Sequence, residues 1–189
     1  PSASPAPEYY GEVDLLHCGE VGDGTLELFR RLDETVARPE EQIVYRTVHR
    51  LPMTEFPTPA YQLIDIRQYL LGCVQYSSGC PFTCEFCDIP SLYGRNPRLK
   101  SPRQILTELD ALADGGTPSI YFVDDNFIAN PRAALDLLPH LVEWQRHRDY
   151  SVRLSWELTL NVAEYPEILK LMRDAYMTNV FCGIETVEP

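Results

Sequence analysis

The sequence predicts an α/β fold in which parallel strands alternate with helices, preceded by a smaller βα piece. Three observations support this prediction. Strand-like and helix-like segments alternate from residue 71 to residue 185, and polar residues stand where the strand-like segments end. A proline-rich stretch separates this region from residues 1–50. Alternating strands and helices favour a parallel sheet with right-handed crossovers. A closed eight-stranded barrel needs roughly 250 residues, so the four strands of residues 71–189 would make the first half of one.

Residues 13–34 predict one strand and one amphipathic helix, with a turn at Gly22 and Gly24 between them. A single βα unit lacks a sheet of its own, so we expect residues 1–50 to be the end of a larger domain. Residues 51–70 should form an extended linker, because prolines exclude a helix or a central strand. The prolines of this stretch are Pro52, Pro57 and Pro59.

The region after the linker shows four strand-like and three helix-like segments. The first helix has the clearest signals, because Ser101 can cap it, Gln104 completes a capping box and two glycines end it. Pro139 lies inside the second helix and is expected to kink it. The expected strands are residues 71–77, 119–123, 152–158 and 179–185, and the expected helices are residues 101–116, residue 130 onward, and 164–175.

Chemically useful side chains follow each expected strand. Carboxyl ends of parallel strands meet at one edge of a sheet, so we expect these side chains to converge there. Alternative roles are a turn cap for the acidic trio after the second strand and a structural ion pair for Glu185. In chain order the candidates are Cys80, Cys84 and Cys87; Asp124, Asp125 and Asn126; Glu157 and Asn161; and Glu185.

Cys80, Cys84 and Cys87 stand in the pattern C-x3-C-x2-C, directly after the first of these strands. Thiolates are the usual ligands of a four-iron cluster, and three of them would leave one iron open to a non-protein ligand. A closed zinc site needs a fourth Cys or His, and the next histidine along the chain is His140. The pattern therefore predicts an iron–sulfur cluster with an open corner, and zinc is the alternative.

The remaining three cysteines lie within apolar runs, which predicts small buried side chains: Cys18, Cys73 and Cys182. Six cysteines without a recognisable export signal indicate reduced thiols and a place in the cytoplasm. The formal charge of −12 argues against nucleic-acid binding, which requires a basic surface. No apolar run reaches the roughly 18 residues of a membrane-spanning helix.

The cysteine pattern, with the aromatic residue Phe86 before its last cysteine, resembles that of the radical S-adenosylmethionine (SAM) enzymes. The strings "VQYSSGCPFTCEFCDIPSLYGRNPRLKSP", "YFVDDNFI", "ELTLN" and "VFCGIET" are similar to the cobalamin-binding branch of that superfamily, and most similar to its hopanoid-methylase type. The resemblance implies the first half of a radical SAM partial TIM barrel at residues 71–189. It also implies that residues 1–50 are the end of a Rossmann-like cobalamin-binding domain.

The resemblance implies three cofactors: a [4Fe–4S] cluster on the three cysteines, SAM bound to its free iron, and cobalamin. Reductive cleavage of SAM would give a 5′-deoxyadenosyl radical that activates an unreactive carbon, which then receives a methyl group. The residues implied to hold SAM are Asp124, Asp125 or Asn126 at its amino group, where many relatives have a glycine-rich acidic stretch, together with Glu157 and Glu185.

The resemblance also implies a small-molecule or lipid substrate, of hopanoid type in the most similar case, and an electron donor such as a flavodoxin or ferredoxin. A lipid substrate would bring a cytoplasmic enzyme to a membrane surface. A radical SAM reaction without methylation, such as a cyclisation or an oxidation, is the alternative outcome. Because the sequence stops just after the fourth strand, we expect a fragment that is inactive by itself.

Overall fold

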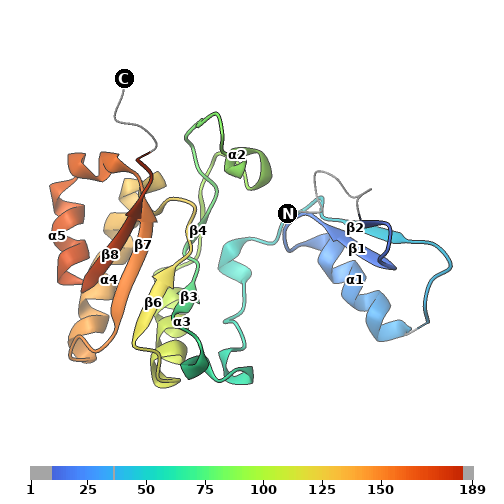
Figure 1. Ribbon diagram of the computed structural model, residues 1–189, viewed down its shortest axis with the longest axis horizontal. Helices are drawn as coiled ribbons and strands as arrows, with labels where there is room; N and C mark the ends of the chain where they lie inside the picture. The colour runs from blue at the N-terminus through green and yellow to red at the C-terminus, as the bar shows by residue number, and fades with distance from the viewer. Residues whose placement is uncertain (1–9, 36, 185–189) are drawn as a thin grey trace. The chain divides into compact units, whose positions relative to one another are not determined.

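The computed structural model describes residues 10–35 and 37–184. The chain divides after Glu55 into two compact units, and each unit has its own sheet (Figure 1). Within the described ranges, no helix is both long and apolar enough to cross a membrane.

The first unit contains two parallel strands, β1 (Leu15–Cys18) and β2 (Ile43–Arg46), with helix α1 (Asp23–Glu34) between them in the chain. β1 and α1 confirm the sequence prediction, whereas β2 corrects the expectation of a single strand. The strand was missed because its four residues form a ladder with a distant segment, which no local pattern reports. Gly24 allows the close approach of α1, since a Cβ there would lie 2.6 Å from the carbonyl carbon of Arg46.

The second unit is built on a four-stranded parallel sheet whose strands lie side by side in chain order (Figure 1). In that order the strands are β3 (Gly72–Val74), β6 (Ser119–Phe122), β7 (Arg153–Leu158) and β8 (Met177–Cys182). The helices that connect them are α3 (Pro102–Asp114), α4 (Pro131–His147) and α5 (Pro166–Asp174). This arrangement confirms the predicted α/β fold with parallel strands.

The core lies on the face of this sheet that the helices cover. Strand residues that point to it include the fully buried Ile120, Phe122, Leu154 and Trp156. Successive residues of a strand point to opposite faces. Cys73 is therefore exposed, because its neighbour Val74 takes the inward position. The expectation that Cys73 is buried was wrong. Cys18 is buried as expected, and Cys182 is partly buried.

The helix signals of the sequence correspond to real helix ends. Ser101 caps α3, because its Oγ accepts a hydrogen bond from the Gln104 amide at 3.3 Å while the Gln104 Oε1 accepts one from the Ser101 amide at 2.9 Å. Helix α4 begins at Pro131 and continues through Pro139 to His147. The proline therefore does not divide the helix.

The segment expected to be an extended linker contains short 3-10 turns, at Met53–Glu55, Tyr61–Leu63 and Ile66–Gln68. Ile66 is 6% exposed and belongs to the core of the second unit, and Tyr61 packs against that core. The prolines exclude longer helices and strands, as predicted, but single turns remain compatible with them. Burial of Ile66 against the core stabilises the last of these turns.

Between β3 and α3 the chain makes an excursion that begins and ends at one short antiparallel ribbon. The strands of the ribbon are β4 (Ser77–Ser78) and β5 (Arg98–Leu99), and the single-turn helix α2 (Ile89–Leu92) lies between them in the chain. The sequence predicted an unbroken strand over residues 71–77. That strand is divided, because its last residues leave the parallel sheet and pair with the returning chain instead.

Candidate functional site

The three cysteines of the C-x3-C-x2-C pattern lie in the excursion between β4 and β5, which we call the cysteine loop (residues 79–97). All three thiols are unpaired. Cys84 is exposed, and Cys80 and Cys87 are partly buried. The two legs of the loop meet at its base, where the Cys80 amide donates to the Gly94 carbonyl oxygen at 3.1 Å.

Gly79 is required where the loop leaves the ribbon. Its φ of +102° is unfavourable for other residues, and a Cβ there would lie 2.8 Å from the carbonyl oxygen of Gly94. The glycine at the start of the motif thus allows the two legs to approach each other closely.

The chemistry of these side chains fits an iron–sulfur cluster, since three unpaired thiols stand within eight positions and thiolates are its usual ligands. In the described part of the chain, no three His, Cys, Asp or Glu side chains are gathered closely enough to hold a metal ion. Burial raises the pKa of the Cys80 thiol, whereas hydrogen bonds from the Phe82 backbone and the Asn126 side chain act to lower it. The nearby Cys87 thiol and Asp125 carboxylate add smaller contributions that raise it. Cys80 therefore lies within electrostatic reach of both groups.

Asp124 ends β6 and is a buried structural acceptor. Its Oδ1 accepts hydrogen bonds from the amides of Tyr76 at 2.7 Å and Ser77 at 2.5 Å, and its Oδ2 accepts one from Trp156 Nε1 at 3.0 Å. The side chain is 1% exposed. Burial raises its pKa to about 6, although these hydrogen bonds favour the ionised form. Both oxygens of this buried carboxylate therefore accept hydrogen bonds from protein groups.

The next two residues also bind protein groups. Asp125 is partly exposed, and its Oδ2 accepts a hydrogen bond from the Gly79 amide at 2.7 Å. Asn126 is 2% exposed. Its Oδ1 accepts from the Ile128 amide at 3.2 Å, and its Nδ2 donates to Thr159 Oγ1 at 3.2 Å. The turn-capping role that the sequence left open is thus present at Asn126, which caps the 3-10 turn Phe127–Ala129.

Glu157 and Asn161 lie at the carboxyl end of β7, at the same edge of the sheet. Glu157 is partly buried and accepts a hydrogen bond from the Tyr121 hydroxyl of β6. Asn161 accepts one from the Thr159 hydroxyl, which itself accepts from Asn126. A chain of polar contacts therefore joins the ends of β6 and β7. Glu185, the remaining candidate, lies outside the described residues.

A hollow of about 390 Å³ lies between the cysteine loop and the end of β7. Phe82, Thr83 and Cys84 line it from the loop, and Thr159 and Asn161 line it from the β7 side. The structure thus brings one of the three cysteines together with the polar residues after β7. Strand alternation could have indicated Tyr121 as a neighbour of Glu157, because both residues point to the uncovered face. The place of Thr159 gave no signal in the sequence.

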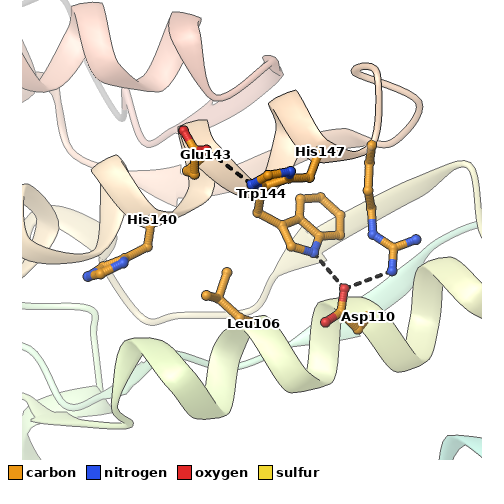
Figure 2. A pocket seen from close by; sticks show the side chains of 7 residues that line it. Leu106, Asp110, His140, Glu143, Trp144 and His147 are labelled. Carbon is orange, nitrogen blue, oxygen red and sulfur yellow. Dashed lines mark hydrogen bonds and ion pairs between the residues drawn. The ribbon is translucent and has the colours of Figure 1, made fainter.

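A second hollow, of about 480 Å³, lies between α3 and α4 (Figure 2). Asp110 Oδ1 accepts hydrogen bonds from Trp144 Nε1 at 2.8 Å and from Arg148 at 2.7 Å, and His147 lies 3.1 Å from Glu143. Helices antiparallel to the strands place their carboxyl ends at the opposite edge of a parallel sheet. This hollow is therefore remote from the cysteine loop, and its charged groups mostly bind one another.

Comparison with protein families gives a match over residues 74–189 to the family described as the radical SAM superfamily. Over 190 aligned residues the chain is 58% identical to the hopanoid C-2 methylase of Rhodopseudomonas palustris (strain TIE-1), covering 100% of this chain and 36% of that protein. It is 26% identical over 137 residues to the hopanoid C-3 methylase of Methylococcus capsulatus (strain Bath), covering 69% of this chain and 25% of that protein. The chain spans about a third or less of the length of these relatives.

Two solved structures share the fold. The cobalamin-dependent SAM radical enzyme OxsB, with aqua-cobalamin and SAM bound, matches with a TM-score of 0.74 at 23% identity, over 97% of this chain and 30% of that one. The radical SAM methyltransferase TsrM of Kitasatospora setae, with tryptophan and a SAM analogue bound, matches with a TM-score of 0.57 at 20% identity, over 66% of this chain and 24% of that one. Both likenesses support the same α/β architecture.

Proposed function

The chain belongs to the radical SAM superfamily, and from this premise we propose that Cys80, Cys84 and Cys87 ligate three irons of a [4Fe–4S] cluster. The superfamily uses such a cluster together with SAM, which would bind the fourth iron. The observation that carries the proposal is the set of three unpaired thiols in the cysteine loop, inside the segment that matches the family. When bound, the cluster supplies one electron for the cleavage of SAM.

The chain's own residues are proposed to orient SAM beside the cysteine loop. Glu157 is a suitable partner for the positively charged amino group, because its carboxylate is partly exposed and stands at the strand edge next to the loop. Glu185 remains a second proposed contact, beyond the described residues. Asp124 and Asn126 are almost fully buried and bind protein groups, which disfavours them for this role. Asp125 binds the Gly79 amide and Glu157 the Tyr121 hydroxyl, so one protein partner does not by itself exclude a carboxylate. We propose the role for the two glutamates. The hollow beside Cys84 offers an open surface on which part of the ligand could lie.

The proposed outcome is cobalamin-dependent methylation of an unactivated carbon, and the proposed substrate class is a hopanoid-type lipid. The support is the 58% identity to a protein named hopanoid C-2 methylase. Residues 1–50 would then be the end of a cobalamin-binding domain, 51–70 a linker, and 71–189 the first half of the radical SAM domain. A flavodoxin or ferredoxin would deliver the electron, and the protein would work from the cytoplasm at a membrane surface. The relatives do not favour a non-methylating reaction or a zinc module.

The cluster is tested by anaerobic reconstitution with iron and sulfide. The chain should take up about four irons and four sulfides and show broad visible absorption, and Cys84→Ala should abolish this uptake. Cys73→Ala is the matched control, because that thiol is exposed on the open sheet face and lies outside the motif. Stoichiometric zinc with no iron uptake would contradict the proposal.

Methylation is tested separately on the longer protein of which this chain is expected to be a fragment, with SAM that carries a deuterated methyl group, cobalamin, a reductant and a hopanoid lipid. The expected product is the lipid with one added deuterated methyl group, detected by mass spectrometry. Formation of 5′-deoxyadenosine together with a cyclised or oxidised lipid would show that the radical chemistry is right and that the methyl-transfer outcome is wrong.

A further inference from the structure

Two consecutive carboxylates at the end of β6 bind the backbone that leads into the first cysteine. Asp124 Oδ1 accepts from the amides of Tyr76 and Ser77, at 2.7 and 2.5 Å, and Asp125 Oδ2 accepts from the amide of Gly79 at 2.7 Å. Donors and acceptors are 46 to 48 residues apart in the chain. The contacts therefore tie the start of the cysteine loop to a different strand.

These amides need acceptors outside the parallel sheet. β3 ends at Val74, so the chain that follows has left its ladder with β6. Tyr76, Ser77 and Gly79 are all buried, and a buried amide without an acceptor is costly. Ionised acceptors make stronger hydrogen bonds than neutral ones. A pair of carboxylates thus accepts hydrogen bonds from three buried amides of the segment that leaves the parallel sheet.

The orientation of Asp124 is itself fixed. Its second oxygen accepts from Trp156 Nε1 at 3.0 Å, and the Trp156 ring is stacked on Phe122 with a centroid separation of 3.6 Å. A carboxylate can accept on both oxygens at once, whereas an asparagine would have to turn its NH2 group toward either the indole or the two amides. The site therefore distinguishes Asp from Asn at this position.

The direction of the chain at Cys80 is set from both sides. Asp125 holds the Gly79 amide, one residue before the thiol, and the Cys80 amide donates to the Gly94 carbonyl oxygen at 3.1 Å on the returning leg. Asp125 is partly exposed, but the oxygen that binds Gly79 faces the backbone. The carboxylate thus acts on the loop through its main chain.

We propose that Asp124 and Asp125 are positioning residues for the cysteine loop: they fix the backbone before Cys80 and so aim its thiol toward the cluster, without contacting cluster or SAM. This role rests on the proposed function, since it assumes that the loop holds a cluster. It gives the acidic pair after the second strand a task different from binding the amino group of SAM.

The test compares Asp125→Ala and Asp125→Asn with the wild-type chain, first without iron. Amide hydrogen exchange at Gly79 should be about tenfold or more faster in Asp125→Ala, because its acceptor is gone, and close to wild type in Asp125→Asn, which keeps one oxygen. The same variants are then reconstituted, and iron loss to a strong iron(II) chelator is timed. Asp125→Ala should lose iron several-fold faster, and Asp125→Asn should be largely rescued.

Asp124→Asn should accelerate exchange at Tyr76 and Ser77 and also speed iron loss. Asp136→Asn, an exposed substitution of the same kind on α4, is the matched control and should change neither readout. If Asp124→Asn does not fold, the two Asp125 variants still decide the question.

The outcomes separate this inference from the proposed function. If the wild-type chain takes up no iron, the proposed function fails, and with it the role in aiming a cluster ligand. If the Gly79 amide of Asp125→Ala exchanges at the wild-type rate, and this variant loses iron no faster than wild type, the positioning role is overturned while the cluster proposal stands. It is equally overturned if the Asp125 variants change only the affinity for SAM, because the carboxylate would then contact the ligand directly.

Discussion

The conformation of the cysteine loop depends on a single residue, Gly79, which has a positive φ and leaves no room for a Cβ. Gly79→Ala should lower the free energy of unfolding by about 1–3 kcal/mol, through left-handed backbone strain and the contact with Gly94. Gly116→Ala is the control, since Gly116 has a φ of +93° but its Cβ would lie 3.5 Å from the nearest atoms, which belong to the Arg67 side chain. Urea denaturation should show a smaller loss for Gly116→Ala, and equal losses would contradict the steric explanation.

Asp124 predicts a pH dependence of stability. Burial raises its pKa in the folded chain to about 6 from the ordinary 3.8, so the folded state binds the proton more tightly than the unfolded state. The contribution of Asp124 to the free energy of unfolding is therefore fully present below pH 3.8 and is lost as the pH rises through about 6. Urea titrations should show that the free energy of unfolding decreases by up to about 3 kcal/mol between pH 4 and pH 7. The same decrease in Asp124→Asn would assign it to other groups.

At the residue scale, the sequence was informative where a chemical type is rare and its spacing is tight. Three thiols in eight positions pointed to one site without a structure. The sequence could not reveal that Asp124 accepts hydrogen bonds from Tyr76, Ser77 and Trp156, because those partners come from distant segments. An acidic residue at a strand end has the same local pattern whether it binds a ligand or a buried amide.

Among the elements, helices α3 and α4 are held together by a polar network around one carboxylate. Asp110 binds both Trp144 Nε1 and Arg148, so Asp110→Ala should lower the free energy of unfolding by about 1–2 kcal/mol. Iron content after reconstitution should not change, because the network lies away from the cysteine loop. Glu143→Gln, which alters only exposed ion pairs on α4, should stay within about 0.5 kcal/mol of wild type. A loss of iron in Asp110→Ala would contradict this separation.

The elements that could be predicted are those with a strong local signal. α3 has a capping box, an apolar stripe and two glycines at its end, and each acts within a few residues. β2 and the β4–β5 ribbon were missed because they consist of two to four residues, and their stability comes from partners across the chain. The 3-10 turn that contains Ile66 depends likewise on the core against which it packs.

At the scale of the whole chain, two separately packed units differ in the size of their cores. Among the described residues of the first unit, few apolar side chains are buried (Leu16, Cys18, Tyr45 and Met53), and α1 leaves Leu26, Phe29 and Leu32 about half exposed. Small units with little buried surface are marginally stable. We therefore expect two unfolding transitions in urea, with the first unit unfolding at the lower concentration.

Core substitutions assign these two transitions. Leu16→Ala should shift only the first transition, and Leu154→Ala, at a fully buried position of β7, only the second, by about 2–5 kcal/mol if the cavity does not collapse. Tyrosine fluorescence and circular dichroism report both units, while the two tryptophans, Trp144 and Trp156, report the second unit alone. One cooperative transition that both variants shift together would show that the units are energetically coupled.

The ribbon at the base of the cysteine loop has a consequence for how this region can vary in length. Because β4 and β5 already bring the two ends of the loop together, the entropy of closing it grows only with the logarithm of its length. Doubling the length of such a segment costs about 0.6 kcal/mol. Extra residues between α2 and β5, after the last cysteine, would leave the spacing of the three thiols unchanged. The loop can therefore gain surface for a partner or a substrate by insertion at little cost in stability, while β3 and α3 keep their places.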